Sequence, residues 1–101
     1  MTDNKKKFSC DFNIEAKIPK GIYENFVSVQ ASLMGLRGYI EATAQGFKGK
    51  LESENKELLE KIKQIMEKSK DFIALITKAA FTEIKEIEKF TEETFKINKS
   101  T

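Results

Sequence analysis

The chain has 101 residues, 34% of them charged, and a formal net charge of +2. This length predicts one domain with its own hydrophobic core and leaves no room for a second functional domain. The sequence contains no histidine, which excludes histidine general bases, histidine-containing catalytic triads and most zinc or haem sites.

The excess positive charge is concentrated at the N-terminus. Residues 1–7 contain three lysines and one aspartate, and the rest of the chain has as many acidic as basic side chains. We expect residues 1–7 to form a disordered basic arm and residues 8–101 to form the domain. A balanced domain lacks the basic patch of nucleic-acid binders, so no nucleic-acid partner is expected. The arm lacks the apolar stretch of a secretory signal and no segment is long and apolar enough to span a bilayer, so we expect a cytoplasmic protein without a membrane partner.

The first expected element is a half-buried strand over residues 8–18. Its polar residues alternate with Phe8, Cys10, Phe12, Ile14, Ala16 and Ile18. Cys10 lies on the apolar side, so we interpret it as a small core residue and not as a catalytic thiol. As the only cysteine, it can form neither an intramolecular disulfide nor a cysteine metal cluster, and no metal site is expected.

A helix is expected next, over residues 22–34, with Gly35 as its stop signal. The apolar residues at helical spacing are Ile22, Phe26, Val29 and Leu33, joined by Tyr23, Val27 and Met34. Residues 38–52 predict two short strands around Gln45 and Gly46.

A second helix is predicted over residues 55–68, with Asn55 or Ser53 as its cap. Its inward residues are Leu58, Leu59, Ile62, Ile65 and Met66. We interpret the aromatic and methionine positions of both helices as core, so no cofactor is expected.

Local pattern alone predicts that a helix continues after Lys68. Apolar residues recur there every three or four positions, at Phe72, Ile76, Ala80, Ile84 and Ile87. Loop, strand and helix all remain open for residues 82–91.

Five segments together resemble the acylphosphatase family. Residues 16–24, AKIPKGIYE, are similar to its G-R-V-Q-G-V-x-F-R, and residues 35–43, GLRGYIEAT, to its G-x-x-G-W-V-x-N-T. Residues 47–52 are similar to V-x-G-x-L/V-x, residues 76–81 to I-D-K-A-N-F, and residues 95–97 to the closing F-x-I. The resemblance implies an α+β, ferredoxin-like β-α-β-β-α-β sandwich, an antiparallel sheet with two helices on one face. It also implies a strand over residues 75–83 and a last strand over residues 95–97.

The two side chains on which the family's chemistry depends are replaced in this register. In acylphosphatases an arginine and the loop amides hold the phosphate of an acyl phosphate, and an asparagine holds the attacking water. The arginine position carries Glu24 and the asparagine position carries Ala42. The resemblance therefore implies an acylphosphatase scaffold without a confident catalytic residue.

The loop before the first helix is the remaining candidate for an anion site. Its residues are Pro19, Lys20, Gly21, Ile22 and Tyr23. Lysines that flank the loop, Lys17 and Lys20, could approach an anion at the helix N-terminus, although both are typical surface residues. Glu24 and Ala42 also have ordinary structural interpretations, as an acid in a first helical turn and a small residue in a strand.

Three functions are compatible with the sequence. The first is a degenerate acylphosphatase-like domain that binds a small anionic ligand or a protein partner. The second is an acylphosphatase with an altered site, in which Lys20 is the candidate residue at the phosphate. The third is RNA binding, which the strand residues Glu15, Lys17, Lys48, Lys50 and Glu52 disfavour, because RNA-binding sheets of this shape expose aromatic residues.

Overall fold

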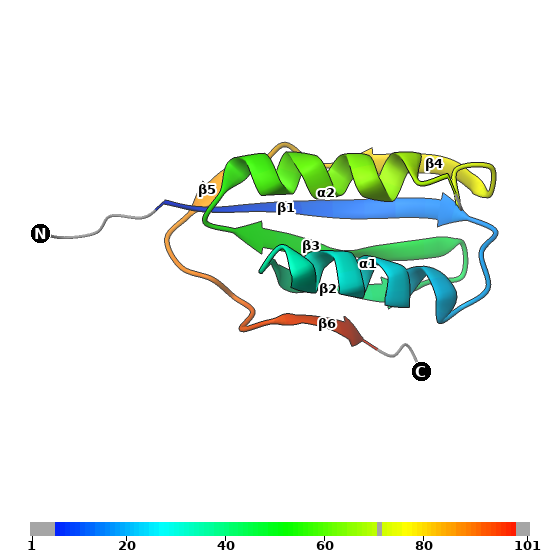
Figure 1. Cartoon of the computed structure of the whole chain (residues 1–101), viewed down its shortest axis with the longest axis horizontal. Coiled ribbons are helices and arrows are strands. Elements are labelled where there is room, and N and C mark those ends of the chain that lie inside the picture. Colours follow the sequence, from blue (N-terminus) through cyan, green and yellow to red (C-terminus); the bar gives the residue numbers. More distant parts are fainter. Residues whose placement is uncertain (1–5, 71, 99–101) are drawn as a thin grey trace, which may run out of the picture.

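The domain is a sheet covered on one face by two helices (Figure 1). The computed structural model describes residues 6–70 and 72–98. In chain order the elements are β1 (Lys7–Ala16), α1 (Ile22–Leu33), β2 (Arg37–Ala42), β3 (Gly46–Ser53), α2 (Lys56–Lys68), β4 (Ile76–Phe81), β5 (Lys85–Ile87) and β6 (Phe95–Asn98). The predicted arm falls mainly on residues 1–5, which lie outside the described residues, and Lys7 already belongs to β1.

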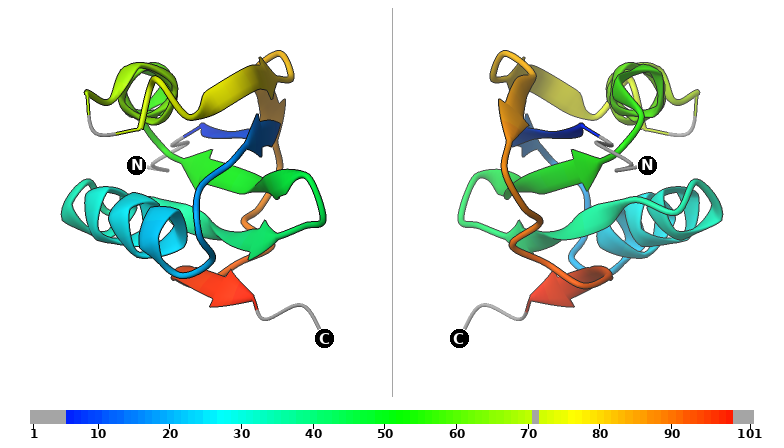
Figure 2. Two further views of the ribbon diagram at one scale, coloured as in Figure 1. Left: turned by 90° about the vertical axis from the view of Figure 1, so that its right-hand side faces the viewer. Right: turned by 90° about the vertical axis from the view of Figure 1, so that its left-hand side faces the viewer.

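The strands form one sheet in the order β4-β1-β3-β2-β6, and β5 pairs with the first residues of β1. Every pairing is antiparallel except that of β2 with β6, which is parallel. Both helices lie on the same side of this sheet, as the end-on views in Figure 2 show. The predicted α+β, ferredoxin-like fold is therefore confirmed, with a parallel edge strand added.

The interior strand β1, which lies between β4 and β3, follows the alternation in its sequence. Cys10, Phe12 and Ile14 are buried against the helices, while Asp11 and Asn13 are exposed. This is the pattern of a strand with one face on the core, because successive side chains point to opposite faces. Cys10 has no exposed surface, as expected for a small core residue.

The inward face of α1 agrees only in part with the expected apolar residues. Tyr23, Val27 and Ala31 are fully buried, whereas Val29 and Leu33 are 55% and 78% exposed. Two apolar stripes satisfy the helical period here. The buried stripe contains the small Ala31, which lets the helix approach the sheet closely, and Val29 and Leu33 face outward.

The second helix, α2, agrees with its prediction. Asn55 is the cap, and its side-chain oxygen accepts a hydrogen bond from the Glu57 amide at 2.9 Å. Ser53 supports the cap by accepting a hydrogen bond from the Asn55 amide. Leu59, Ile62 and Met66 are buried; the other two expected inward residues, Leu58 and Ile65, are half-buried.

The chain after α2 forms strands. The prediction that a helix continues there is therefore wrong, and the strand that the resemblance implies is confirmed. β4 pairs antiparallel with β1, and Phe12 lies opposite Phe81. Apolar residues four positions apart fit a strand as well as a helix, since four is a multiple of the two-residue strand period. Residues 82–91 contain β5 and otherwise no regular element.

The connection from β5 to β6, orange in Figure 2, crosses the sheet on the side away from the helices. It covers Glu52, which the sequence places on an exposed strand face but which has no exposed surface. The Glu52 carboxylate accepts hydrogen bonds from the Thr91 amide, the Thr91 hydroxyl and the Glu92 amide at 2.7–3.2 Å. A buried carboxylate is stable when donors satisfy it in this way, and here the donors come from a remote segment.

Candidate functional site

The loop between β1 and α1 forms one side of the candidate site. The carbonyl of Pro19 accepts a hydrogen bond from the Ile22 amide at 3.4 Å, which turns the chain into the helix. Gly21 is the N-cap residue with a φ of +96°, a conformation that glycine adopts without the strain of a side chain. The Ile22 amide, the first of α1, is thus satisfied within the loop, and the Asn25 amide donates to the Gly21 carbonyl at 3.3 Å.

Glu24 is the third residue of α1 and folds back onto this loop. Its carboxylate accepts a hydrogen bond from the Gly21 amide at 2.6 Å. The residue is only 6% exposed. An acid at this position also interacts favourably with the helix dipole, by about 0.3–1 kcal/mol.

A cavity of about 430 Å³ brings together the two residues at the positions where the resemblance implies the family's arginine and asparagine. It is lined by Lys20, Gly21, Glu24, Asn25, Ala42, Ile97 and Asn98. Ala42 ends β2, and the parallel pairing of β2 with β6, in which Glu41 lies opposite Asn98, carries Asn98 to the same place. Glu24 and Ala42 thus share one pocket with two of the predicted loop residues, Lys20 and Gly21.

The other three loop candidates lie away from this pocket's lining. Pro19 is exposed and Ile22 is 53% exposed. Tyr23 belongs to the core, where its hydroxyl donates a hydrogen bond to the Met66 carbonyl at 2.8 Å. Burial raises the pKa of the Tyr23 phenol, which keeps it protonated as a donor. A role for these three residues would have to come from their backbones.

Sequence reasoning missed three residues of the pocket: Asn25, Ile97 and Asn98. Asn25 directly follows Glu24 in the first turn of the helix, so the sequence could have indicated that it lies near the pocket. Asn98 lies one residue beyond the closing F-x-I, and only the parallel pairing of β6 with β2 places it beside Ala42. Both carboxamides can donate and accept hydrogen bonds.

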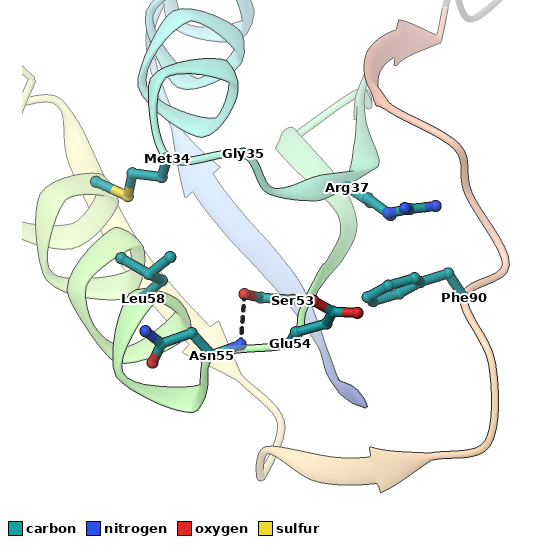
Figure 3. Close-up of a pocket in the computed structure, with 8 residues that line it drawn as sticks. All are labelled: Met34, Gly35, Arg37, Ser53, Glu54, Asn55, Leu58 and Phe90. Atoms are coloured by element: carbon teal, nitrogen blue, oxygen red, sulfur yellow. Dashed lines mark hydrogen bonds between the residues drawn. The ribbon is translucent and has the colours of Figure 1, made fainter. Parts of the chain in front are cut away.

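Arg37, the only arginine, lies at the opposite end of β2 from Ala42. Its guanidinium is 4.1 Å from the centre of the Phe90 ring and donates a hydrogen bond to the Glu92 carbonyl. Figure 3 shows this pair beside a separate cavity of about 270 Å³. Arg37 therefore lies outside the candidate site.

The chemistry of the pocket is mixed. It has one cation, Lys20, one buried carboxylate, Glu24, and two carboxamides. Within residues 6–70 and 72–98 no group of three or more cysteine, aspartate and glutamate side chains could hold a metal ion. No helix in the same residues is long and apolar enough to cross a membrane.

The fold and the position of the pocket define the class of protein: an α+β, ferredoxin-like domain with a pocket between the first loop and the end of β2. The chain belongs to the acylphosphatase family, whose model matches residues 10–97. No match is found among curated protein sequences.

Solved structures support the fold. An acylphosphatase from Bacillus subtilis superposes with a TM-score of 0.68 at 15% identity, covering 91% of this chain and 98% of that one. One from Coxiella burnetii gives 0.63 at 12% identity, covering 93% and 95%. Full-length HypF, solved in a phosphate- and nucleotide-bound form, gives 0.68 at 21% identity, and the match covers 92% of this chain but 12% of HypF.

Proposed function

We propose that this acylphosphatase-family domain does not hydrolyse acyl phosphates and acts by binding a ligand or a protein partner. The observation that carries the proposal is the position of Glu24. Its carboxylate lies in the pocket where the family's arginine is expected, and it already occupies the Gly21 amide.

The electrostatic effect of this replacement is large. A guanidinium about 4 Å from a phosphate charge gives roughly 4 kcal/mol of attraction at the dielectric of a protein surface. A carboxylate at the same place gives repulsion of similar size. Arginine also offers a planar pair of donors that matches two phosphate oxygens, which neither Glu24 nor a nearby lysine can imitate.

Ala42 supports the same proposal from the side of the nucleophile. The family's asparagine holds the attacking water, and a methyl side chain has no polar group for this task. A general feature of catalysis by positioning is that a poorly held nucleophile loses most of its advantage over bulk water. Loss of both side chains from one pocket removes the binding and the positioning part of the reaction together.

The alternative is an acylphosphatase with an altered site. Its supporting observation is that Lys20, Asn25 and Asn98 line the pocket, so a cation and two carboxamides are present at new positions. In this alternative Lys20 would contact the phosphate, and a carboxamide would orient the water.

Hydrolysis of benzoyl phosphate tests the proposal. The wild-type protein should show no turnover above buffer, and the double variant Glu24→Arg, Ala42→Asn should gain measurable turnover. Glu24→Gln is the matched control, because it removes the charge without adding a guanidinium and should stay silent. Circular dichroism checks that each variant is folded.

Clear turnover by the wild-type protein would contradict the proposal and favour the alternative. Lys20→Ala and Asn98→Ala should then each reduce the rate of hydrolysis. Lys78→Ala, at an exposed position outside the pocket, should leave this rate unchanged.

A further inference from the structure

The outward surface of α1 is unusual for this chain. In a sequence with 34% charged residues, the twelve residues of α1 include one charged side chain, Glu24, and that one is buried. The exposed residues include Ile22, Val29 and Leu33 at 53%, 55% and 78%. An apolar stripe without surrounding charge is typical of an interaction surface.

A groove of about 530 Å³ runs between α1 and α2 beside this stripe. It is lined by Phe26, Gln30, Lys61, Gln64, Ile65, Lys68 and Ser69. Phe26 is four residues after Ile22 and three before Val29, so it belongs to the groove and to the stripe. The apolar surface is therefore continuous from the crest of α1 into the groove.

The rim of the groove on α2 is basic. Lys61 and Lys68 are seven residues apart, which places them on the same side of the helix and about 10 Å apart along its axis. Ile65 lies between them, and the residues that line the groove include no acid. The surface thus combines an apolar floor, one basic rim and one uncharged rim.

We propose that this groove docks an amphipathic helix of a protein partner that carries acidic residues along one edge. The apolar face of such a helix would cover Phe26, Ile65 and Val29, in the helix-in-groove mode of recognition. Acidic residues seven positions apart would face Lys61 and Lys68. A second copy of this chain fits less well, because the outward face of its α1 offers no acid, and its α2, which carries Glu60 and Glu67, already has its apolar face buried in its own core.

The groove shares no residue with the 430 Å³ pocket, so this proposal does not depend on the loss of hydrolysis. It gives the domain a partner class whichever way the benzoyl phosphate assay turns out.

Two synthetic peptides of roughly 15 residues, a length at which helix formation becomes practical, test the proposal. Both carry leucines at helical spacing; the acidic probe has two glutamates seven positions apart on one flank, and the basic probe has lysines there. Fluorescence anisotropy with the full chain should show roughly tenfold tighter binding of the acidic probe, with a difference that shrinks as salt is added.

Charge reversal provides the specificity control. The double variant Lys61→Glu, Lys68→Glu should prefer the basic probe, while Lys85→Glu, Lys89→Glu, at exposed positions outside the groove, should keep the wild-type preference. Equal binding of both probes, or binding of neither, would overturn the proposal. Two other results would also overturn it: a dimer that the acidic probe dissociates, or binding of phosphatidylserine vesicles without binding of the probe.

Discussion

The buried carboxylate of Glu52 offers the sharpest test of how this chain holds its last strand. The variant Glu52→Ala removes the acceptor for the Thr91 amide, the Thr91 hydroxyl and the Glu92 amide. Glu52→Gln keeps the volume but places an amide group where donors converge. Both variants should release the segment that leads into β6.

The size of the effect follows from the number of donors. A hydrogen bond to a charged group contributes about 1.5–3 kcal/mol, and three donors are involved here. Two effects reduce this loss. Thr91 is exposed, so water can replace part of the lost hydrogen bonding, and the variant does not have to remove the Glu52 carboxylate from water when it folds. We therefore expect a loss of about 2–4 kcal/mol in the free energy of unfolding, a large part of the 5–15 kcal/mol typical of a domain.

Urea unfolding followed by circular dichroism measures this loss, and hydrogen exchange locates it. The amides of β6 should exchange faster in Glu52→Ala, because the carboxylate anchors the connection that delivers β6 to β2. Glu54→Gln, at a neighbouring exposed position, is the matched control. A loss below about 0.5 kcal/mol, the usual size of a surface effect, would refute the reasoning.

Three positions in the core and sheet give further measurable outcomes. Burial raises the pKa of the Cys10 thiol from 9.0 to about 11, so its contribution to stability is complete below pH 9 and is lost as the pH rises towards 11. Between these pH values, this thiol should lower the free energy of unfolding by at most about 1.4 kcal/mol per pH unit. The free energy obtained from urea unfolding should therefore fall less steeply with pH for Cys10→Ala than for the wild-type protein. Tyr23→Phe removes the hydrogen bond to the Met66 carbonyl near the end of α2 and should cost about 1–2 kcal/mol in the same assay; an unchanged midpoint would contradict this role. Gly38→Ala would place a Cβ 1.9 Å from the Lys50 carbonyl oxygen at a φ of +134°, so it should abolish the cooperative thermal transition, and a folded variant with the wild-type Tm would disprove the β2–β3 register.

The order of elements was predictable because a resemblance resolves what local pattern leaves open. The alternation in β1 and the stripe in α2 each fit one period, and both predictions are confirmed. The chain after Lys68 fits two periods, and only the similarity over residues 76–81 identifies a strand. The inward face of α1 was predicted only in part, with Tyr23 and Val27 named and Ala31 left out, because apolar residues lie on both sides of this helix.

Long-range pairing explains the remaining failures. Alternation places Glu52 on the open face correctly, but no local signal says that residues 91 and 92 will cover it. The same holds for Asn98, which reaches the candidate pocket only because β6 runs parallel to β2. Glu24 and Ala42 were predictable as a pair because their spacing from framework residues is kept.

Glu24 shows why the scaffold can persist when the chemistry is proposed to be lost. The side chain that is proposed to remove the attraction for a phosphate accepts a hydrogen bond from the Gly21 amide and complements the dipole of α1. The helix start is therefore stabilised by the same carboxylate that lines the candidate pocket. Glu24→Arg reverses both effects, since a cation in the first turn opposes the dipole and leaves the Gly21 amide without its acceptor. Any turnover gained by the double variant should thus come with a loss of about 0.5–2 kcal/mol in the free energy of unfolding. A position at which Glu24 has no structural role would show no such loss.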